Sequence, residues 1–375
     1  MHQLIGRFLA FATIAAAAGC SSGKTNTGGS SSSVDCSKLE TPTNADFCSS
    51  DNCNPELDCR HAAQRPINDC CVLVGKPGGG TGATLQRSTS TKKYAGTGAP
   101  DLSCLSPAGY PAKPPSGTPK LVTMQGLVQA FAHGCDMAGV KIEVFKVKRT
   151  SDPATDGELG DLVGSPVSTD TSSTVTLTDT GNCNDPRKDR AYTYANVPMY
   201  TELVVKTTDA SSGQWAPLVT YNIYITDNDP EFSNGVYTHN LEALAADDFQ
   251  TIPTAAISRP ISPGNGAIGG EIHDCGNVRL QNASVDVTAP RSALVYFDDN
   301  EDDPLPKLGR QSTGRTALYA ALDVKPGFAR VAANGLMPDG NGGTKLVSLG
   351  YYNVRVFPDS VTSISLRGLR PFQVP

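Results

Sequence analysis

Two stretches of this chain decide its fold: "AHGCDMAGVKIEVFKV" (Ala132–Val147) and "IHDCGNVRLQNASVDV" (Ile272–Val287). Each contains a histidine, one further residue, a cysteine, a loop and then a run in which apolar and polar residues alternate. Alternation places the apolar side chains on one face of a β-strand, because successive side chains point to opposite faces. The two stretches therefore predict a β-structured unit that occurs twice.

Similar alternating runs surround the first stretch. They are rich in β-branched and aromatic residues, and Gly, Pro, Asp or Asn bound them: "LVTMQGLVQAF", "STVTLT", "AYTYANV", "ELVVKT" and "LVTYNIYIT". Many short strands separated by turn residues are typical of an antiparallel sandwich. One segment, "THNLEALAADDF" (Thr238–Phe249), has helical spacing and predicts a short helix.

The second half of the chain repeats the first. Gly126 before "LVQAFAHGC" corresponds to Gly270 before "EIHDC", and "VKIEVF" to "ASVDVT". Further on, "YANVPMYTELVV" corresponds to "ALDVKPGFARVA", and "LVTYNIYI" to "LVSLGYYNVRV". Matches in the same order indicate a duplication. The sequence thus predicts an all-β protein with two tandem antiparallel β-sandwich domains of prealbumin or Ig-like type, residues 119–256 and 257–375.

These motifs resemble the carboxypeptidase regulatory-like (transthyretin-like) β-sandwich family. The resemblance rests on a first strand with a glycine, the "GVKIEV" run, "YTYANVP" followed by "ELVVKT", and "VKPGFARVAA" in the second copy. It covers about two-thirds of the chain, from Leu121 onward. The chain departs from the family in an insert after Val147, a missing Gly after Pro198 and an acidic loop near Asp298. The resemblance implies a non-catalytic accessory or adhesion-type module.

Composition and motifs argue against two other classes of protein. The net charge is −6 without a basic cluster, which argues against a nucleic-acid partner. The chain has no G-x-S-x-G, H-E-x-x-H, Walker or C-x-x-C-H motif, so we expect no enzyme activity. "GNGAIG" (Gly264–Gly269) fits a dinucleotide pattern but leads into a strand rather than a helix, and we interpret it as a linker.

The first residues predict export and lipid attachment. Arg7 precedes eleven mostly apolar residues, Phe8–Ala18, too few to span a bilayer. Ala17-Ala18-Gly19-Cys20 resembles a bacterial lipobox, which implies a signal peptide over residues 1–19 and a diacylglyceryl group, with a further acyl chain such as palmitate, on Cys20. An ordinary secretory signal is the alternative. Residues 20–35 are a flexible tether. We therefore expect a membrane-anchored protein of the cell envelope, in the outer membrane or at the cell surface.

Eleven cysteines are present, and without the lipidated one ten remain. An even number in an exported protein predicts disulfides. Those expected to be paired are Cys36, Cys48, Cys53, Cys59, Cys70, Cys71, Cys104, Cys135, Cys183 and Cys275. The first six fall in a small disulfide-rich segment, residues 36–74, and residues 75–118 look like a Gly, Pro and Ser-rich linker.

One disulfide can be assigned from the order of the strands. Cys135 follows the first strand and Cys183 follows the third, so an up-and-down order brings both to the same end of the sandwich and predicts a Cys135–Cys183 bond. Cys275 is then left with Cys104, while Cys135–Cys275 is the rival pairing.

Two metal sites are alternatives to these structural roles. His133, Cys135, His273 and Cys275 together would suit zinc if they met, although duplication alone explains their repetition. Clustered carboxylates suit calcium; the candidates are Asp298, Asp299, Glu301 and Asp302 in one loop and Asp227 and Asp229 in another. The preferred interpretation of both loops is a solvated acidic turn, with no cofactor.

The partner is predicted only by class. Trp215 lies in the turn-like "SSGQWAP", which favours exposure and raises the alternative of a carbohydrate-binding face, whereas the tyrosines are expected in the core or on strand faces. We therefore expect an envelope or extracellular protein, or a glycan, as the partner, and adhesion or envelope assembly as the role.

Overall fold

The computed structural model of the protein describes residues 83–89, 93–105, 107–112, 114–150, 152, 154–178, 183–211, 213–301 and 304–372. The predicted signal peptide, Cys20, the tether and the disulfide-rich segment lie outside these ranges. Within them the regular secondary structure is mostly β-strand, as predicted, with one α-helix and two short 3-10 helices. None of the helices in these ranges is long and apolar enough to cross a membrane.

The first half forms a sandwich of two sheets. Its strands are β2 (Leu121–Phe131), β3 (Val140–Val147), β4 (Leu159–Ser168), β5 (Thr174–Thr176), β6 (Lys188–Pro198), β7 (Leu203–Asp209), β8 (Trp215–Ala216), β9 (Leu218–Ile223), β10 (Phe232–Ser233), β11 (Val236–Thr238) and β12 (Leu241–Ala245). One sheet centres on β2, which pairs antiparallel with β6 and parallel with β11 and β12. The other has the order β9-β7-β3-β4.

The second half forms a smaller sandwich, reached through the helix α2 (Ala246–Ile257). Its strands are β13 (Gly266–Glu271), β14 (Leu280–Gln281), β15 (Ser284–Val287), β16 (Ala293–Phe297), β17 (Pro306–Lys307), β18 (Leu318–Val324), β19 (Gly327–Pro338), β20 (Thr344–Val356) and β21 (Val361–Ser363). One sheet has the order β17-β16-β18-β13-β21, and the facing one has the order β15-β19-β20.

The strand pairings repeat between the two halves. In the first half β2 pairs with β6, β5 pairs with β6, and β7 pairs with both β3 and β9. In the second half β13 pairs with β18, β16 pairs with β18, and β19 pairs with both β15 and β20, all antiparallel. A parallel strand then closes each copy, β11 with β12 on β2 and β21 on β13. The structure thus contains two copies of one topology in tandem.

The matched glycines of the two copies sit where this closing strand crosses. A Cβ atom added to Gly126 would lie 2.1 Å from the carbonyl oxygen of His239. One added to Gly270 would lie 1.9 Å from the carbonyl oxygen of Ile364. Real Cβ atoms do not approach backbone atoms this closely, so both copies need glycine for the same steric reason.

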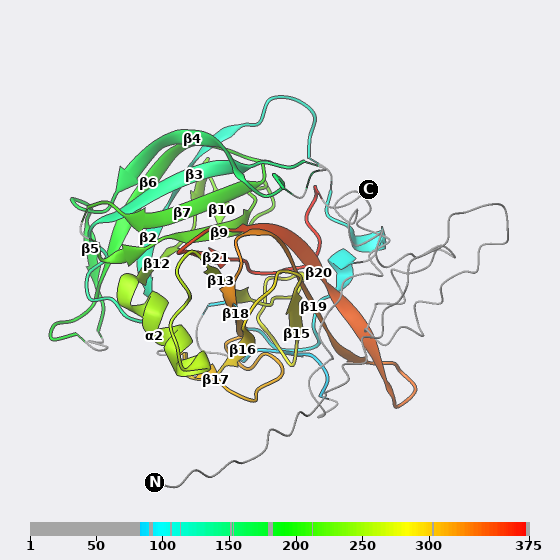
Figure 1. Ribbon diagram of the computed structural model, residues 1–375. Helices are drawn as coiled ribbons and strands as arrows, with labels where there is room; N and C mark the ends of the chain where they lie inside the picture. The colour runs from blue at the N-terminus through cyan, green and yellow to red at the C-terminus, as the bar shows by residue number, and fades with distance from the viewer. Residues whose placement is uncertain are drawn as a thin grey trace, which may run out of the picture.

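The two sandwiches share one sheet. β21 of the second half pairs parallel with β9 of the first, with Val361 opposite Leu218 and Ser363 opposite Thr220. This pairing joins the two partial sheets into a nine-stranded sheet that runs through both halves (Figure 1). The sandwiches are therefore fused edge to edge rather than connected by a free linker.

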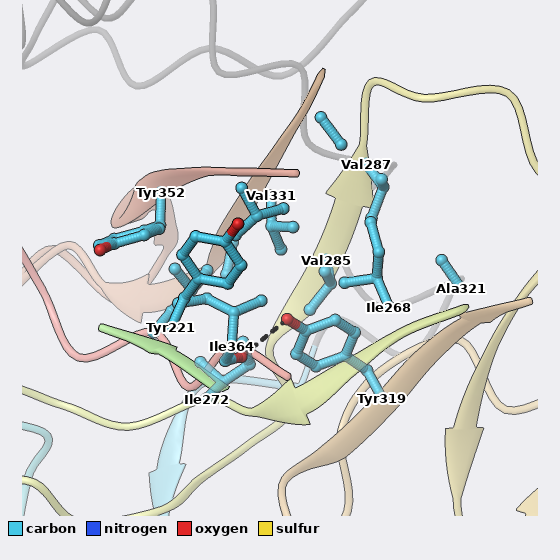
Figure 2. Close-up of a cluster of buried hydrophobic side chains, with 14 of the residues drawn as sticks. Tyr221, Ile268, Ile272, Val285, Val287, Tyr319, Ala321, Val331, Tyr352 and Ile364 are labelled. Carbon is cyan, nitrogen blue, oxygen red and sulfur yellow. Dashed lines mark hydrogen bonds between the residues drawn. The ribbon is translucent and has the colours of Figure 1, made fainter. Parts of the chain in front are cut away.

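Each sandwich has its own core. In the quoted run of the first half, Val140, Ile142 and Val144 are all 0% exposed, as the alternation predicts. The corresponding Val285 and Val287 are buried in the second half. Figure 2 shows this second core, in which the Tyr319 hydroxyl donates a hydrogen bond of 2.9 Å to the carbonyl oxygen of Ile364. Side chains from β9, including Tyr221, enter the second core, so the shared sheet belongs to both cores.

Two sequence predictions need correction. The segment predicted as a helix, Thr238–Phe249, contains the last residue of β11 and the strand β12, and α2 starts only at Ala246. The spacing of Leu241, Leu244 and Phe249 fits a helix, but pairing with β2 makes the first part a strand. On that strand Leu241 packs in the first core, whereas Leu244 packs with Phe249 of α2.

The second correction concerns the linker, residues 75–118. Its first described residues pack on the second sandwich, where β1 (Gln86–Arg87) pairs with β14 and Leu85 is 3% exposed, whereas residues 114–118 are exposed as expected of a linker. The short helices η4 (Ser103–Leu105) and η5 (Pro107–Gly109) follow, and Leu105 is buried against Tyr351. The Gly and Pro residues of this segment form turns, and their abundance does not mean that the segment is unpacked.

Two disulfides are present in the described part of the chain. Cys135 is bonded to Cys183 at 2.04 Å, the pairing that the strand order predicts, and Cys104 is bonded to Cys275 at 2.08 Å. The rival Cys135–Cys275 bond is absent. The Cys104–Cys275 bond ties the predicted linker to the second sandwich across 171 residues of sequence.

We expect loss of the Cys135–Cys183 bond to destabilise the first sandwich. The bond spans 48 residues, and cross-linking a loop of this size lowers the entropy of the unfolded chain. The double variant Cys135→Ser, Cys183→Ser should lose about 2–4 kcal/mol in the free energy of unfolding, measured with denaturant. If reductant lowers the free energy of unfolding equally in the wild type and in the variant, the Cys135–Cys183 bond does not contribute to stability.

Candidate binding cavity between the two sandwiches

A cavity of about 290 Å³ lies at the junction of the two sandwiches. Its lining residues come from β2, β12 and α2 on one wall and from β9, β21, β13 and β18 of the shared sheet on the facing wall. Lys93 and Tyr94 complete the lining at one end. The cavity exists because β9 and β21 pair, since that pairing brings the two halves around it.

The register of β2 and β12 makes the first wall amphipathic. Glu242 lies opposite Gln129, and Leu244 lies opposite Phe131, all four in the lining. Residues two apart on a strand share a face, so both strands present a polar and then an apolar side chain to the cavity. The wall therefore has a polar end and an apolar end.

The facing wall has the same gradient. Leu218, Val361 and Ala267 lie side by side across three strands and form an apolar row. The next row consists of Thr220, Ser363 and Gly269, and beyond it Glu271 lies opposite Leu318. The helix α2 covers the apolar rows with Phe249, Ile252 and Pro253.

The start of α2 is fixed by a histidine from the first repeat motif. Asp248 accepts hydrogen bonds from the backbone N–H of His133 at 3.0 Å and from its Nδ1 at 2.7 Å. Asp248 is 3% exposed. His133 thus holds α2 over the cavity.

His273, from the second motif, lies at the polar end. Its Nε2 is 2.7 Å from Glu271 Oε2, and Arg279 Nε donates to the same oxygen at 2.9 Å. Burial works to raise the pKa of Glu271, but the hydrogen bonds and charges of His273 and Arg279 outweigh it and lower that pKa to about 2. Glu271 is therefore a paired carboxylate, fixed in place.

Glu242 is different. Its side chain is exposed to the cavity, yet protein surrounds it. Among the residues that the structure describes, none forms a hydrogen bond or ion pair with its carboxylate. Burial, followed by repulsion from Glu271, raises the pKa of Glu242 to about 7. Three carboxylates thus line the cavity. Asp248 is paired with His133 and Glu271 with His273 and Arg279, whereas the carboxylate of Glu242 has no hydrogen bond or ion pair among the described residues.

This raised pKa predicts a pH-dependent stability. The pKa of Glu242 is about 7 in the folded state and 4.5 in the unfolded state. Between these pH values the unfolded state loses the proton while the folded state keeps it, so the free energy of unfolding falls as the pH rises from about 4.5 to 7. Glu242→Gln should remove this loss and raise the melting temperature by about 2 °C at pH 8, with no gain at pH 4.5. Scanning calorimetry at both pH values tests this. A gain of the same size at both would show that the effect is not a titration of Glu242.

The rim at Lys93 and Tyr94 is tied down by ion pairs. Lys93 Nζ lies 2.5 Å from Glu231 Oε1, and His239 Nδ1 lies 3.3 Å from Glu231 Oε2. Burial works to raise the pKa of Glu231, but hydrogen bonds from His239 and Lys93 lower it to about 2. The Tyr94 ring contacts that of His273, with centroids 4.9 Å apart. Part of the predicted linker thus closes the polar end.

The predicted zinc ligands do not form a metal site. Cys135 and Cys275 are both in disulfides, so neither offers a thiolate. His273 is 3% exposed, and both of its ring nitrogens are hydrogen-bonded, to Asn277 and to Glu271.

The acidic loops are held by other protein groups in the described ranges. Asp299 Oδ2 is 3.1 Å from Arg310, and Asp298 accepts from the N–H of Asn300. Asp227 accepts from the hydroxyl of Tyr200, and Asp229 from the N–H of Glu231. No three His, Cys, Asp or Glu side chains in these ranges are grouped to hold a metal. Asp302 lies outside the described residues, while Glu301 pairs with Arg315, and calcium binding stays a prediction.

The expected exposure of Trp215 is wrong. The side chain is 6% exposed, lies in the first core, and donates from Nε1 to the carbonyl oxygen of Ala138 at 2.8 Å. The turn-like context did not show that β8 pairs with β12 and buries the ring. Trp215 therefore offers no sugar-stacking face.

Sequence reasoning missed Glu242 and Glu271 as site residues. Each is the single charged residue of an otherwise apolar or glycine-rich strand, Glu242 within "LEALA" and Glu271 at the end of "GAIGGE". A lone charge in such a strand is a usable signal in the sequence, although it does not say which group the side chain faces.

No protein-family model and no curated protein matches the chain. Among solved structures, a streptococcal ancillary pilin is 13% identical and matches 66% of this chain and 62% of its own, with a TM-score of 0.18. The shaft pilin SpaA from Lactobacillus rhamnosus GG is 9% identical and matches 67% of this chain and 100% of its own, with a TM-score of 0.18. The chain spans less than two thirds of the streptococcal pilin. TM-scores this low carry no argument about function, so the assignment of a tandem β-sandwich rests on the topology above.

Proposed function

We propose that the protein is a non-catalytic binding module of the cell envelope, anchored in the membrane by a lipid on Cys20, and that it acts in adhesion or in assembly with another envelope component. The observation that carries the proposal is the nine-stranded sheet shared by both sandwiches. A sheet that continues through two cores makes one rigid body, which suits a module that presents its surface to a partner at the end of a flexible tether.

The seam between the halves supports the rigid-body interpretation. Arg149 and Glu202 of the first sandwich meet Tyr352 of the second, where the Tyr352 hydroxyl and the Arg149 guanidinium both donate to the Glu202 carboxylate. Arg149 also donates to the carbonyl oxygen of Asn353 at 3.0 Å. These contacts, the β9–β21 pairing and the two cores resist bending at the seam.

The cavity chemistry supports binding rather than turnover. Hydrolysis by paired carboxylates needs one that gives a proton and one that acts as base or nucleophile. Here Glu271 is engaged by His273 and Arg279, which leaves Glu242 as a single carboxylate without a partner in the described chain. One such group can select a ligand.

We expect the lipid anchor to require Cys20. Cells expressing the wild type should hold the protein in the membrane fraction, with a mature N-terminus at an acylated Cys20, as seen by intact-mass spectrometry. Cys20→Ser should abolish the acylation and shift most of the protein to the soluble fraction, because a single thiol carries the diacylglyceryl group. Ser21→Ala is the matched control and should stay in the membrane. A wild-type mature start at another residue would refute the anchor.

The envelope partner can be sought by crosslinking on intact cells. A photo-crosslinker placed at exposed Leu308, beside β17, or at exposed Leu162 on β4 samples the two opposite edges of the nine-stranded sheet. A defined adduct from one position identifies the interacting face. Absence of adducts from both positions, with labelled protein at the surface, would argue against a protein partner at these edges.

A further inference from the structure

The strongest unassigned feature is the charge balance of the cavity. Its polar end is faced by Glu242 from β12, by Glu271 and Arg279 from the second sandwich, by His239 before β12 and by Lys93 at the rim. Asp248 lies at α2. Lys93 and His239 pair with Glu231, Arg279 and His273 with Glu271, and His133 with Asp248. Among the acidic and basic lining residues that the structure describes, Glu242 is the one without such a pair.

The neutral polar side chains beside Glu242 already have hydrogen-bond partners in the protein. Gln129 Nε2 donates to Asp189 at 2.7 Å, and Gln129 Oε1 accepts from Asn240 at 3.0 Å. The Asn240 oxygen accepts from the N–H of Leu127. The neighbours of Glu242 are therefore fixed in place, and an occupant of the cavity must bring its own donor to this carboxylate.

The apolar end of the cavity determines which chemical group the rest of the ligand must carry. It is lined by the rows of Leu218, Val361 and Ala267, by Phe131 and Leu244, and by the cover of α2. An occupant that reaches from Glu242 to this end would bury an apolar body there, since burial of apolar surface is favourable. A volume of about 290 Å³ matches a small molecule or one side chain.

We infer that the cavity binds an alkylammonium group, with the ammonium at the Glu242 carboxylate and the apolar chain between α2 and the row of Leu218, Val361 and Ala267. An ammonium is a compact charge with three donors and so can pair with a single carboxylate. The group can belong to a free amine or to a lysine side chain of a partner. This inference goes beyond the proposed function and depends on the cavity alone, not on the lipid anchor.

The experiment compares three probes of one shape: hexylamine, hexan-1-ol and hexanoate. Binding is measured by isothermal titration calorimetry on the complete exported chain carrying Cys20→Ser, so that no detergent competes for the cavity. At pH 8 we expect hexylamine to bind at least ten-fold more tightly than hexan-1-ol, and hexanoate not to bind. Hexylamine affinity should fall as pH is lowered from 8 to 5.5, because protonation of Glu242 removes the counter-charge.

Two variants and one control separate charge from shape. Glu242→Gln should reduce hexylamine binding at least ten-fold, leave hexan-1-ol unchanged and remove the pH dependence. Gly269→Val should abolish binding of both, because a side chain at residue 269 points to the cavity, where an added Cβ meets only the Tyr319 carbonyl oxygen at 3.5 Å. Asp161→Asn, an equal change of charge at an exposed site on β4, should bind as the wild type does.

The outcomes are distinct. Equal affinity for hexylamine and hexan-1-ol, or an unchanged affinity in Glu242→Gln, overturns the assignment of a cation. No binding of any probe to the wild type overturns the cavity as a ligand site and leaves the envelope proposal untouched. Nα-acetyl-lysine methylamide separates the two sources, because binding tighter than that of hexylamine indicates a lysine of a partner, and weaker binding indicates a free amine.

Discussion

Replacement of Gly270 by alanine is expected to destabilise the protein by about 4 kcal/mol or more in the free energy of unfolding, enough to prevent folding of the second sandwich at 37 °C. The added methyl group would lie 1.9 Å from the carbonyl oxygen of Ile364 and close to its carbonyl carbon. Both are backbone atoms of the segment that follows β21, so relief requires β21 to move. β21 is also the strand that pairs with β9, and its movement would open the seam.

The neighbouring glycine provides the control. A Cβ atom added to Gly269 meets only the Tyr319 carbonyl oxygen at 3.5 Å, an ordinary contact, so Gly269→Ala should stay within about 0.5 kcal/mol of the wild type. Gly126→Ala, at the matched position of the first copy, should fail as Gly270→Ala does. Chemical denaturation of the variants measures the three differences. If Gly270→Ala is as stable as Gly269→Ala, the close crossing does not exist in solution.

The second large effect is expected at the seam. Glu202→Ala should cost about 3–4 kcal/mol, because it leaves Arg149 and the Tyr352 hydroxyl without their shared acceptor. Glu202 is 9% exposed at its side chain. Burial works against the charge of Arg149, but attraction to Glu202 outweighs it and raises the pKa of Arg149 above its usual range. In this variant Arg149 would still contact solvent and the nearby Asp156. The expected loss of stability therefore lies near the lower end of the range for buried ion pairs.

Glu143→Ala is the matched control for this prediction. Glu143 pairs with Lys141 at 2.8 Å on the same strand, where Lys141 is 40% exposed, and loss of such a pair costs about 0.5 kcal/mol. Thermal and chemical denaturation compare the two variants. Equal losses would show that the Arg149–Glu202–Tyr352 group does not hold the sandwiches together.

Local pattern was sufficient where a strand's environment is set by its own sequence. The alternation in "VKIEVFKV" predicted the burial of Val140, Ile142 and Val144, because a strand with one face in a core must alternate. The order of the runs predicted the duplicated topology, and with it the Cys135–Cys183 bond. The matched Gly126 and Gly270 were visible as a repeat, although their crowded crossings were not.

Local pattern failed where distant segments decide the outcome. The run after Thr238 has helical spacing, yet its first part is a strand because β2 offers it a parallel partner. The turn around Trp215 favours exposure, yet β8 and the first core cover the ring. The predicted linker is rich in Gly and Pro, yet Leu85 and Leu105 find apolar surface on the second sandwich.

By itself, the sequence determined the strands, their repetition and one disulfide, since each depends on spacing along the chain. Only the tertiary structure decided that β21 pairs with β9, that the two sandwiches become one body, and that a cavity with Glu242 at its polar end lies between them. The pairing joins residues about 140 positions apart in sequence and leaves no periodic trace, because either strand alone would look the same beside any other partner.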